Sequence, residues 1–503
     1  MKKKTTTTTT MLGVFMISLL IISNPSLSFS QQAAADDDDP TGVCIIGSGI
    51  AGSSVAHFLR HYSDHSSPPR TIRIFERHSV VGGRMATVSL AGQTFEAGAS
   101  ILHPKNYHAL NYAKSLNLSI RKPSPSSFSL GIWDGHRFIF KTLTSHSKFP
   151  FLQKIVSLTN SFLMFFRYGF SLFRMGNFVK GAVDSFLKYY ESFESRPVFE
   201  TVDEMLKWAG LQNLTARTLQ EELVDAGLST LLIQELVTVI TRINYGQSVD
   251  ISGLAGAVSL AGSGGGLWAI EGGNWQMASG LIKSSNVSLH LQEEIKSISY
   301  LGNYYELNST KGNSYNCEVT VVAAPLDELN IHFMPAISIP KRKLQHTHTT
   351  FVRGLLNPAY FGLSEASEIP ELVGTIESSD IPFSSISLLK QQTGNDMSYK
   401  IFSRAPLADA FLDSIFSVRT ETVRINWAAY PHYKAPERFA PFALDDQHLY
   451  YVNAFENAAS TMETSAVAAE NVARLILSRS YGLAKSNQKK SSPLDAYPLH
   501  SDL

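Results

Sequence analysis

Three glycines and one acid near the N-terminal end of the sequence have the spacing of a dinucleotide site. The apolar run Val43 to Ile46 leads into a glycine-rich turn that reads Gly47-Ser48-Gly49-Ile50-Ala51-Gly52. In such a turn the first glycine permits a tight bend, the second lets the backbone approach a pyrophosphate at a helix N-terminus, and the third allows close helix–strand packing. Glu76, at the end of the next apolar run, can accept hydrogen bonds from ribose hydroxyls. The order predicts dinucleotide binding; the alternative is a glycine-rich turn in an ordinary βαβ unit.

A second pair of glycines, closed by an arginine, indicates which dinucleotide is bound. Gly82, Gly83 and Arg84 follow Glu76 and Arg77 after a short interval. Adjacent glycines expose backbone N–H groups, and a guanidinium can bind pyrophosphate oxygens through two parallel hydrogen bonds. Because a nicotinamide dehydrogenase has no need of this second set of donors, we expect FAD.

These motifs resemble those of the glutathione-reductase-type FAD proteins, in the amine-oxidase and phytoene-desaturase branch. The resemblance implies that the second glycine pair covers the flavin diphosphate and that residues 98–100 make the next flavin contact. It also implies that Ile295 lies against the adenine and that the backbone of Met462 contacts the isoalloxazine. The expected cofactor-binding residues are therefore Gly47, Ser48, Gly49, Ile50, Ala51, Gly52, Glu76, Arg77, Gly82, Gly83, Arg84, Gly98, Ala99, Ser100, Ile295 and Met462.

Three longer stretches resemble the prenylcysteine oxidase family of FAD thioether oxidases, and its plant branch in particular. They are Gly98 to Asn106, Glu271 to Trp275 and Leu449 to Thr464, and the resemblance extends over residues 41–480. It implies oxidation of S-farnesyl-L-cysteine during the degradation of prenylated proteins. A hydride leaves the allylic carbon bonded to sulfur, water adds, and the hemithioacetal collapses to cysteine and a prenyl aldehyde. Dioxygen accepts the electrons and becomes hydrogen peroxide.

The cysteines bear on how the flavin is held. No cysteine follows Cys317, so the C-terminal thioether attachment found in some flavin amine oxidases is excluded, and we expect non-covalent FAD. Cys44 and Cys317 are interpreted as small buried hydrophobes, with a disulfide between them as the alternative. A polyamine-type amine oxidase is the competing enzyme, but it would need acidic residues along its tunnel. A flavoprotein or lipid carrier without turnover is the non-enzymatic alternative.

The sequence does not identify a catalytic base. His103 is a weak candidate because imidazole titrates near neutral pH; the alternative is a backbone-bonded histidine before a turn proline. Trp427 and Tyr430 are interpreted either as aromatic walls facing the flavin or as core. Glu456 and Glu463 could orient the flavin or cap the last helix. No metal ligands are expected.

The alternation of strands and helices predicts an α/β fold. An FAD-binding Rossmann-like domain of the glutathione-reductase type is expected in three pieces, 41–106, 265–330 and 441–483. A mixed α+β substrate domain would be interleaved with it, at 107–264 and 331–440. Strands at Val287 to Leu291, Ile295 to Tyr300 and Tyr304 to Leu307 predict a meander. The apolar stretch Ile155 to Phe166 is too short to span a bilayer and is interpreted as a buried helix or the wall of a lipid channel.

The N-terminal segment predicts entry into the secretory pathway. Residues 1–30 contain a basic start and an apolar run of signal-peptide length, followed by an acidic linker at 31–40. A disordered tail is expected at 484–503. Four N-x-S/T sequons are candidate glycosylation sites: Asn117, Asn213, Asn286 and Asn308. The resemblance implies a lysosome or vacuole as the final compartment.

The balance of charge limits the partners. The 43 basic residues equal the 43 acidic ones, and no basic stripe argues for nucleic acid. We expect a small apolar thioether and O₂ as partners, no transmembrane span in the mature chain, and at most a peripheral membrane contact.

Overall fold

The computed structural model describes residues 42–63, 71–122, 129–143, 149–193, 195–391 and 397–480. All of them belong to one compact unit, Asp36–Leu503. The predicted signal peptide (1–30), linker (31–40) and tail (484–503) lie outside the described residues. Within the described ranges, no helix combines the length and apolar character needed to cross a membrane.

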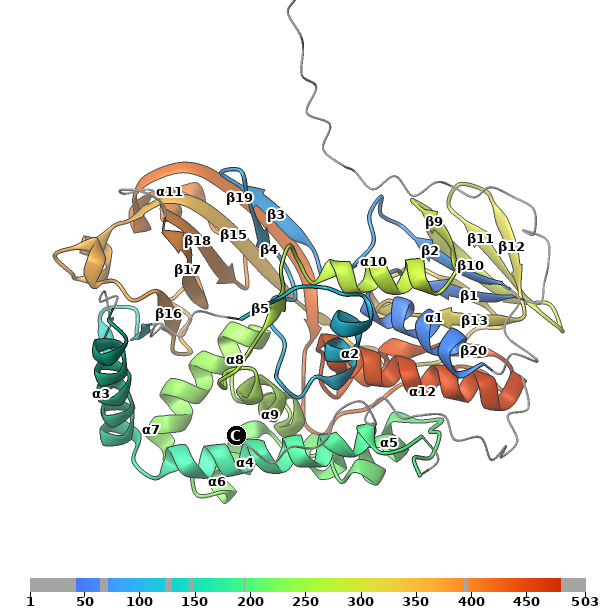
Figure 1. The fold of residues 1–503 in the computed structure, drawn as a ribbon, viewed down its shortest axis with the longest axis horizontal. Coiled ribbons are helices and arrows are strands. Elements are labelled where there is room, and N and C mark those ends of the chain that lie inside the picture. Colours follow the sequence, from blue (N-terminus) through green and yellow to red (C-terminus); the bar gives the residue numbers. More distant parts are fainter. Residues whose placement is uncertain are drawn as a thin grey trace, which may run out of the picture. The chain divides into compact units, whose positions relative to one another are not determined.

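A parallel sheet of five strands carries the dinucleotide motif (Figure 1). The fully buried central strand β1 pairs on both sides, with Ile45 opposite Ile74 on one neighbour and Val321 on the other. Strands covered on both faces are expected to be continuous apolar runs. The order across the sheet is β20 (Leu449–Tyr451), β13 (Val319–Val322), β1 (Val43–Ile46), β2 (Ile72–Glu76) and β9 (Ser288–Leu291).

Helices from distant parts of the chain pack beside this sheet. Helix α1 (Ile50–Tyr62) follows β1 directly and contacts both α10 (Trp275–Ser284) and α12 (Met462–Ser480). Helix α2 (Tyr107–Ser115) in turn contacts α10 and α12. The last strand, β20, leads into the 3₁₀ helix Val452–Asn457 and then into α12.

A second, smaller sheet contains the predicted meander. Strands β10 (Ile295–Tyr300), β11 (Tyr305–Ser309) and β12 (Ser314–Cys317) are antiparallel, and β14 (His332–Met334) joins β10 in parallel. The prediction that the strand near Val287 belongs to this meander is wrong. That strand is β9, which pairs in parallel with β2. Helix α10 precedes β9 and returns the chain to the same end of the sheet, which a parallel pairing requires.

A seven-stranded sheet forms the second large layer (Figure 1). Its two longest strands, β15 and β19, pair along almost their whole length. Its order is β19 (Phe416–Pro431), β15 (Leu344–Leu356), β18 (Met397–Ser403), β17 (Ser385–Gln391), β16 (Leu372–Thr375), β6 (Leu130–Trp133) and β7 (Phe138–Lys141). Smaller ladders pair β3 (Thr87–Leu90) with β4 (Gln93–Glu96) and β5 (Ile120–Arg121) with β8 (Ala269–Ile270).

Most of the remaining helices lie between α2 and α10 in sequence. They are α3 (Pro150–Tyr168), α4 (Ser171–Phe186), α5 (Val202–Ala209), α6 (Leu219–Asp225), α7 (Thr230–Leu232), α8 (Thr238–Tyr245) and α9 (Gly253–Ala261), with α11 (Asp409–Ile415) before β19. The expectation that Ile155 to Phe166 is a buried helix is wrong. This stretch is part of α3, where Leu158, Phe162 and Phe166 are exposed. The channel-wall interpretation is also wrong, because no α3 residue lines the cavity described below.

A disulfide joins Cys44 of β1 to Cys317 at the end of β12. The interpretation of the two residues as separate buried hydrophobes is therefore wrong, and the alternative of a bridge is what the structure contains. Their Cα atoms are 5.8 Å apart although 273 residues separate them in the chain. The sheet pairing of β1 with β13, which follows Cys317 closely, brings them together.

Candidate functional site

One cavity of about 1250 Å³ is lined by both large sheets and their connections. It is larger than the roughly 300–1,000 Å³ typical of small-molecule sites. All of the predicted cofactor-binding residues except Gly52 line it, together with His103, Trp427 and Tyr430. The fold thus gathers residues from both ends of the chain around a space large enough for a dinucleotide and a second ligand.

The turn after β1 has the shape that a diphosphate requires. Gly47 adopts φ +108°, a conformation that L side chains rarely take. A Cβ on Gly52 would lie 2.0 Å from the carbonyl oxygen of Gly47, so this helix can approach the strand only with glycine there. Helix α1 begins at Ile50 with no side-chain cap and no acid in its first turn. Its first N–H groups therefore remain available to an anion.

Glu76 also fixes the turn from the neighbouring strand. Its Oε2 accepts hydrogen bonds from the backbone N and the Oγ of Ser48, at 3.1 and 2.6 Å. Its Oε1 accepts one from the backbone N of His78 at 2.9 Å. A carboxylate has about four acceptor positions, so capacity for a ribose hydroxyl remains. Arg77 beside it is exposed, with its Nε directed to His78.

Arg84 connects the nucleotide end of the cavity to the seven-stranded sheet. Its Nη1 donates to the carbonyl of Ala429 on β19 at 2.7 Å and pairs with the buried carboxylate of Glu456. Glu456 also accepts from Arg342 at 3.3 Å. Burial opposes ionisation, but Arg84 and then Arg342 hold the pKa of Glu456 below its usual value. Nη2 and Nε of Arg84 point to no acceptor among the described residues and can face a diphosphate.

The remaining predicted contacts enclose the cavity from other directions. Ile295 is the first residue of β10; it is buried and lines the cavity. Met462 begins α12, and Thr461 caps this helix by accepting from the backbone N of Thr464 at 3.0 Å. The positive end of the α12 dipole therefore faces the cavity, which suits a ring that gains negative charge. Glu463 points elsewhere: its carboxylate accepts from the N–H groups of His108 and Ala109 and so caps α2.

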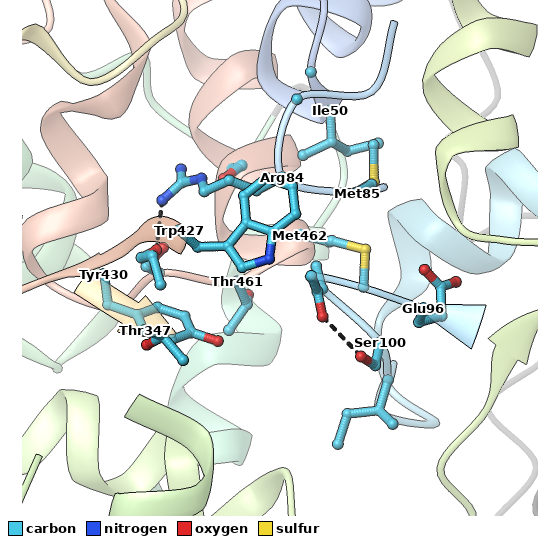
Figure 2. Close-up of a pocket in the computed structure, with 18 of the residues that line it drawn as sticks. Ile50, Arg84, Met85, Glu96, Ser100, Thr347, Trp427, Tyr430, Thr461 and Met462 are labelled. Atoms are coloured by element: carbon cyan, nitrogen blue, oxygen red, sulfur yellow. Dashed lines mark hydrogen bonds between the residues drawn. The ribbon is translucent and has the colours of Figure 1, made fainter. Parts of the chain in front are cut away.

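Aromatic side chains from β19 form the opposite wall. Figure 2 shows Trp427 and Tyr430 projecting towards the same space as Met462 and Met85. Trp427 is fixed by a 3.0 Å hydrogen bond from its Nε1 to the carbonyl of Ala97. Tyr430 packs edge to face against Tyr245. Both aromatic residues thus have a core contact and a cavity-facing surface, which combines the two interpretations that the sequence left open.

A buried lysine is the main feature that the sequence analysis missed. Lys400 on β18 lines the cavity, and its Nζ donates to the carbonyl of Glu96 at 2.9 Å and to Oγ of Ser100 at 3.1 Å. Burial lowers the pKa of Lys400 to about 8, although Glu96 opposes the shift. Burial likewise raises the pKa of Glu96 to about 7. In an alternating strand, apolar Tyr399 and Ile401 on either side of Lys400 predict that the lysine faces solvent, so the local sequence offered no signal for its burial.

His103 is held as a backbone-bonded turn residue. Its Nδ1 accepts from the backbone N of Lys105 at 3.1 Å, and its own N–H donates to Asn106 Oδ1. Burial and then Lys105 lower the pKa of His103. A neutral imidazole with Nδ1 as acceptor carries its proton on Nε2. No nitrogen then remains free to take a proton, so Lys400 is the better candidate.

The four sequons differ in their accessibility. Asn117, Asn213 and Asn286 are exposed, and Asn117 and Asn286 occupy turns with positive φ. Asn308 is half-buried in β11, where its Nδ2 donates to Glu306 at 3.0 Å. The first three sites can accept a glycan more readily than the fourth.

The comparisons with known proteins agree with these features. A model described as "Prenylcysteine lyase" matches residues 151–489, and one described as "NAD(P)-binding Rossmann-like domain" matches residues 45–116. The chain is 65% identical to farnesylcysteine lyase of Arabidopsis thaliana, with 92% of this chain and 93% of the relative covered. It is 35% identical to human prenylcysteine oxidase 1, over 88% and 89% of the two chains.

A solved structure shows the same fold at low sequence identity. Cyclohexylamine oxidase from Brevibacterium oxydans superposes with a TM-score of 0.58 at 17% identity, covering 87% of this chain and 98% of that one. The predicted α/β class, with a Rossmann-like domain of the amine-oxidase branch, is thereby confirmed. On the strength of the family model and the two relatives, this chain belongs to the prenylcysteine lyase family.

Proposed function

We propose that this protein is an FAD-dependent oxidase that cleaves the thioether of S-farnesyl-L-cysteine. The reaction consumes the thioether, O₂ and water and yields farnesal, free cysteine and hydrogen peroxide. The observation that carries the proposal is a single cavity whose one end presents a diphosphate cradle and whose other end presents an apolar, aromatic wall. The sequence similarity to farnesylcysteine lyase and prenylcysteine oxidase 1 supports the same substrate class.

The cradle fits FAD in its donors and in its free space. The turn at Gly47 to Gly49 and the N–H groups of α1 would hold the diphosphate, Glu76 the ribose, and the start of α12 the isoalloxazine. When bound, FAD accepts the hydride from the carbon bonded to sulfur and passes the electrons to dioxygen. The protein's own contribution is to bind, align and shield the reactants.

The apolar end of the cavity matches a prenyl chain. Burial of fifteen prenyl carbons contributes of order 10 kcal/mol before ordering and association costs, at about 0.8 kcal/mol per CH₂. Trp427 and Tyr430 would keep stray water from the reacting carbon. The apolar residues that line this end include seven from three helices and two strands: Phe186, Ile243, Tyr245, Leu254, Val258, Leu389 and Phe402.

Lys400 is positioned to accept the proton released when water adds. A neutral amine has two N–H donors, and here two acceptors, Glu96 O and Ser100 Oγ, are already in place for them. The remaining lone pair of Nζ can then point into the cavity. Because the pKa of Lys400 is about 8, about a tenth of the molecules carry the neutral amine at pH 7, and this fraction rises with pH.

FAD is held without a covalent bond in this proposal. The only cysteines, Cys44 and Cys317, are bonded to each other, so neither offers a thiol to the flavin. We expect mild acid or denaturant to release all flavin from the purified yellow protein. Flavin that remains on the precipitated chain would show attachment through another residue.

We further propose synthesis through the secretory pathway, with a lysosome-like or vacuolar destination. A disulfide between Cys44 and Cys317 supports an oxidising compartment, and exposed sequons support glycosylation. N-terminal sequencing is expected to find a start near Ser30, and glycosidase treatment to reduce the mass. A glycan-free product that starts at Met1 would contradict this route.

Chain-length selectivity tests the substrate proposal. Farnesylcysteine should exceed geranylgeranylcysteine in kcat/KM by about 5- to 150-fold, the range for overfilling a closed pocket by about 1–3 kcal/mol. S-methylcysteine should be slower still, because it lacks both the allylic stabilisation and the apolar surface. Peroxide release and free cysteine are measured for each, with spermine as the amine-oxidase control. Equal rates for the two prenyl substrates would remove the length selectivity, and peroxide from spermine alone would favour an amine oxidase.

A further inference from the structure

The helical hairpin formed by α3 and α4 presents an apolar stripe to solvent. Along α3 the exposed residues recur on one face, at Phe151, Ile155, Leu158, Phe162 and Phe166, with Phe166 83% exposed and Leu158 73%. The stripe continues through two phenylalanines of the turn and α4, Phe170 and Phe173. Contiguous exposed apolar surface of this kind marks an interaction site.

The opposite side of the same hairpin is packed against the protein. Leu163 and Met164 of α3 and Leu172, Met175 and Phe178 of α4 contact buried residues of α6, α8 and the strands. Arg167 is fixed to Glu235 by two hydrogen bonds of 2.7 and 2.6 Å. The folded domain therefore sets the orientation of the helices, and no described residue covers the stripe.

Cations outnumber acids along the hairpin, although Glu235 pairs with Arg167 and Asp184 with Lys180. Between Asp134 and Asp184 the sequence contains no Asp or Glu, whereas it contains Arg137, Lys141, Lys148, Lys154, Arg167, Arg174 and Lys180. Lys154 and Arg174 are exposed on the two helices. In a chain whose basic and acidic residues are equal in number, this segment is locally basic. Apolar and aromatic residues flanked by cations are typical of helices that lie in an anionic membrane surface.

Helix α4 also connects the stripe to the cavity. Its C-terminal part contributes Ala182, Val183 and Phe186 to the cavity lining, while Phe173 near its N-terminal end belongs to the stripe. Figure 1 shows α3 at the edge of the described molecule, with α4 leading inward from it. A ligand that dissolves in lipid could therefore reach the cavity along this helix.

We propose that the α3–α4 hairpin docks the protein on an anionic lipid bilayer by inserting Phe151, Leu158, Phe162, Phe166 and Phe170 at the headgroup boundary. Docking places the cavity where a prenylated thioether is concentrated. That benefit rests on the proposed function, but lipid binding itself does not.

Vesicle flotation of the purified holoprotein tests the proposal. The wild type should float with phosphatidylcholine–phosphatidylserine vesicles and less with phosphatidylcholine alone. Phe162→Ser combined with Phe166→Ser should lower binding to the mixed vesicles by about tenfold or more. Leu301→Ser combined with Val418→Ser, which removes exposed apolar residues elsewhere, should bind as the wild type does. Lys154→Glu should weaken binding to the mixed vesicles only. Because all variants keep the same N-terminal segment, differences in flotation between them reflect the substituted residues and not that segment.

Several outcomes would overturn the docking proposal. One is equal flotation of the wild type and the F162S/F166S variant, and another is no flotation of the wild type. A third is a dimer in analytical ultracentrifugation that F162S/F166S dissociates without any lipid binding, which would assign the stripe to a second copy of this chain. Peroxide release from farnesylcysteine in vesicle-free buffer is measured in parallel. Its absence, with flotation intact, would refute the proposed function and leave docking standing.

Discussion

The wall of the cavity built by the β1 and β2 turns differs from the wall built by β15, β18 and β19 in what it presents to a ligand. The first presents glycines, backbone N–H groups and a helix N-terminus, which recognise an anion whatever reaction follows. The second presents side chains, among them Trp427, Tyr430 and Lys400, whose amine lies over the ring of Phe402. From this difference we expect the first wall to govern retention of the cofactor and the second wall to govern the choice of reaction. Substitutions in the two walls should therefore fail in different ways.

The largest effect is expected at a glycine of the first wall. Gly52→Ala places a methyl group 2.0 Å from the Gly47 carbonyl, so α1 cannot keep its position and the protein should lose FAD and much of its soluble yield. The matched control is Gly181→Ala, a helical glycine of α4 whose Cβ would meet no atom within 4 Å. That control should retain FAD and gain up to about 1 kcal/mol in stability. Flavin absorbance per polypeptide measures both, and a fully yellow G52A protein would contradict the packing argument.

In the second wall, removal of one amine should reduce the rate and leave the cofactor in place. Lys400→Met is expected to lower kcat by about 10²-fold or more, the scale of general acid–base catalysis, with full FAD content. In the wild type, kcat/KM should rise with pH and level off above about 8, as Lys400 loses its proton.

Lys400→Arg serves as the charged control. Because its guanidinium does not deprotonate in this range, the rise of kcat/KM with pH should vanish. A pH profile that is unchanged in both variants would exclude Lys400 as the proton acceptor.

The disulfide gives a further test of the difference between the walls, because it anchors β1, the strand that leads into the first wall. Cys44→Ala combined with Cys317→Ala removes a link that spans 273 residues. The free energy of unfolding should fall by about 2–4 kcal/mol, while kcat with saturating FAD stays near the wild-type value. Thermal melts with and without reductant provide the measurement. An unchanged melting temperature in the double variant would argue against a stabilising role.

Arg84 touches both walls and should give the smallest effect. Arg84→Ala should weaken FAD retention by about 1.5–3 kcal/mol, as expected for loss of a hydrogen bond to a charged group. It also leaves Glu456 with Arg342 as its remaining cation. Flavin dissociation during dialysis, compared between the variant and the wild type, reports the change. Equal FAD retention in the variant and the wild type would mean that Arg84 serves only to bind Ala429 and Glu456 and does not hold the diphosphate.

The two walls also differed in how far the sequence predicted them. Residues Val43 to Gly52 form strand, turn and helix from consecutive positions, so their spacing alone predicted this local structure. Lys400 depends on Glu96 and Ser100, about three hundred positions away. No local sequence pattern indicates that Lys400 contacts Glu96 and Ser100. The Cys44–Cys317 bridge was left open for the same reason, since the closeness of β1 and β12 arises only when the sheets assemble.

The prediction that helix α3 is buried was wrong for a different reason. Its apolar residues occur on nearly every side, so no continuous polar face indicates which side of the helix meets solvent. Burial was then the default interpretation. The packed residues Leu163 and Met164 and the exposed Phe162 and Phe166 are neighbours in the same run. Only the position of the surrounding elements decides which of them reach the core.

The order of strands in the parallel sheet has a consequence for biosynthesis. β1 lies between β13 and β2, and the sheet ends at β20, whose first residue is Leu449. At roughly 5–20 residues per second, the ribosome makes β20 and Met462 on the order of 20–80 s after β1. A nascent or truncated chain therefore has the phosphate turn but lacks Met462, the residue proposed to contact the flavin ring. We therefore expect the yellow colour to appear only in a polypeptide that has been translated at least as far as Met462.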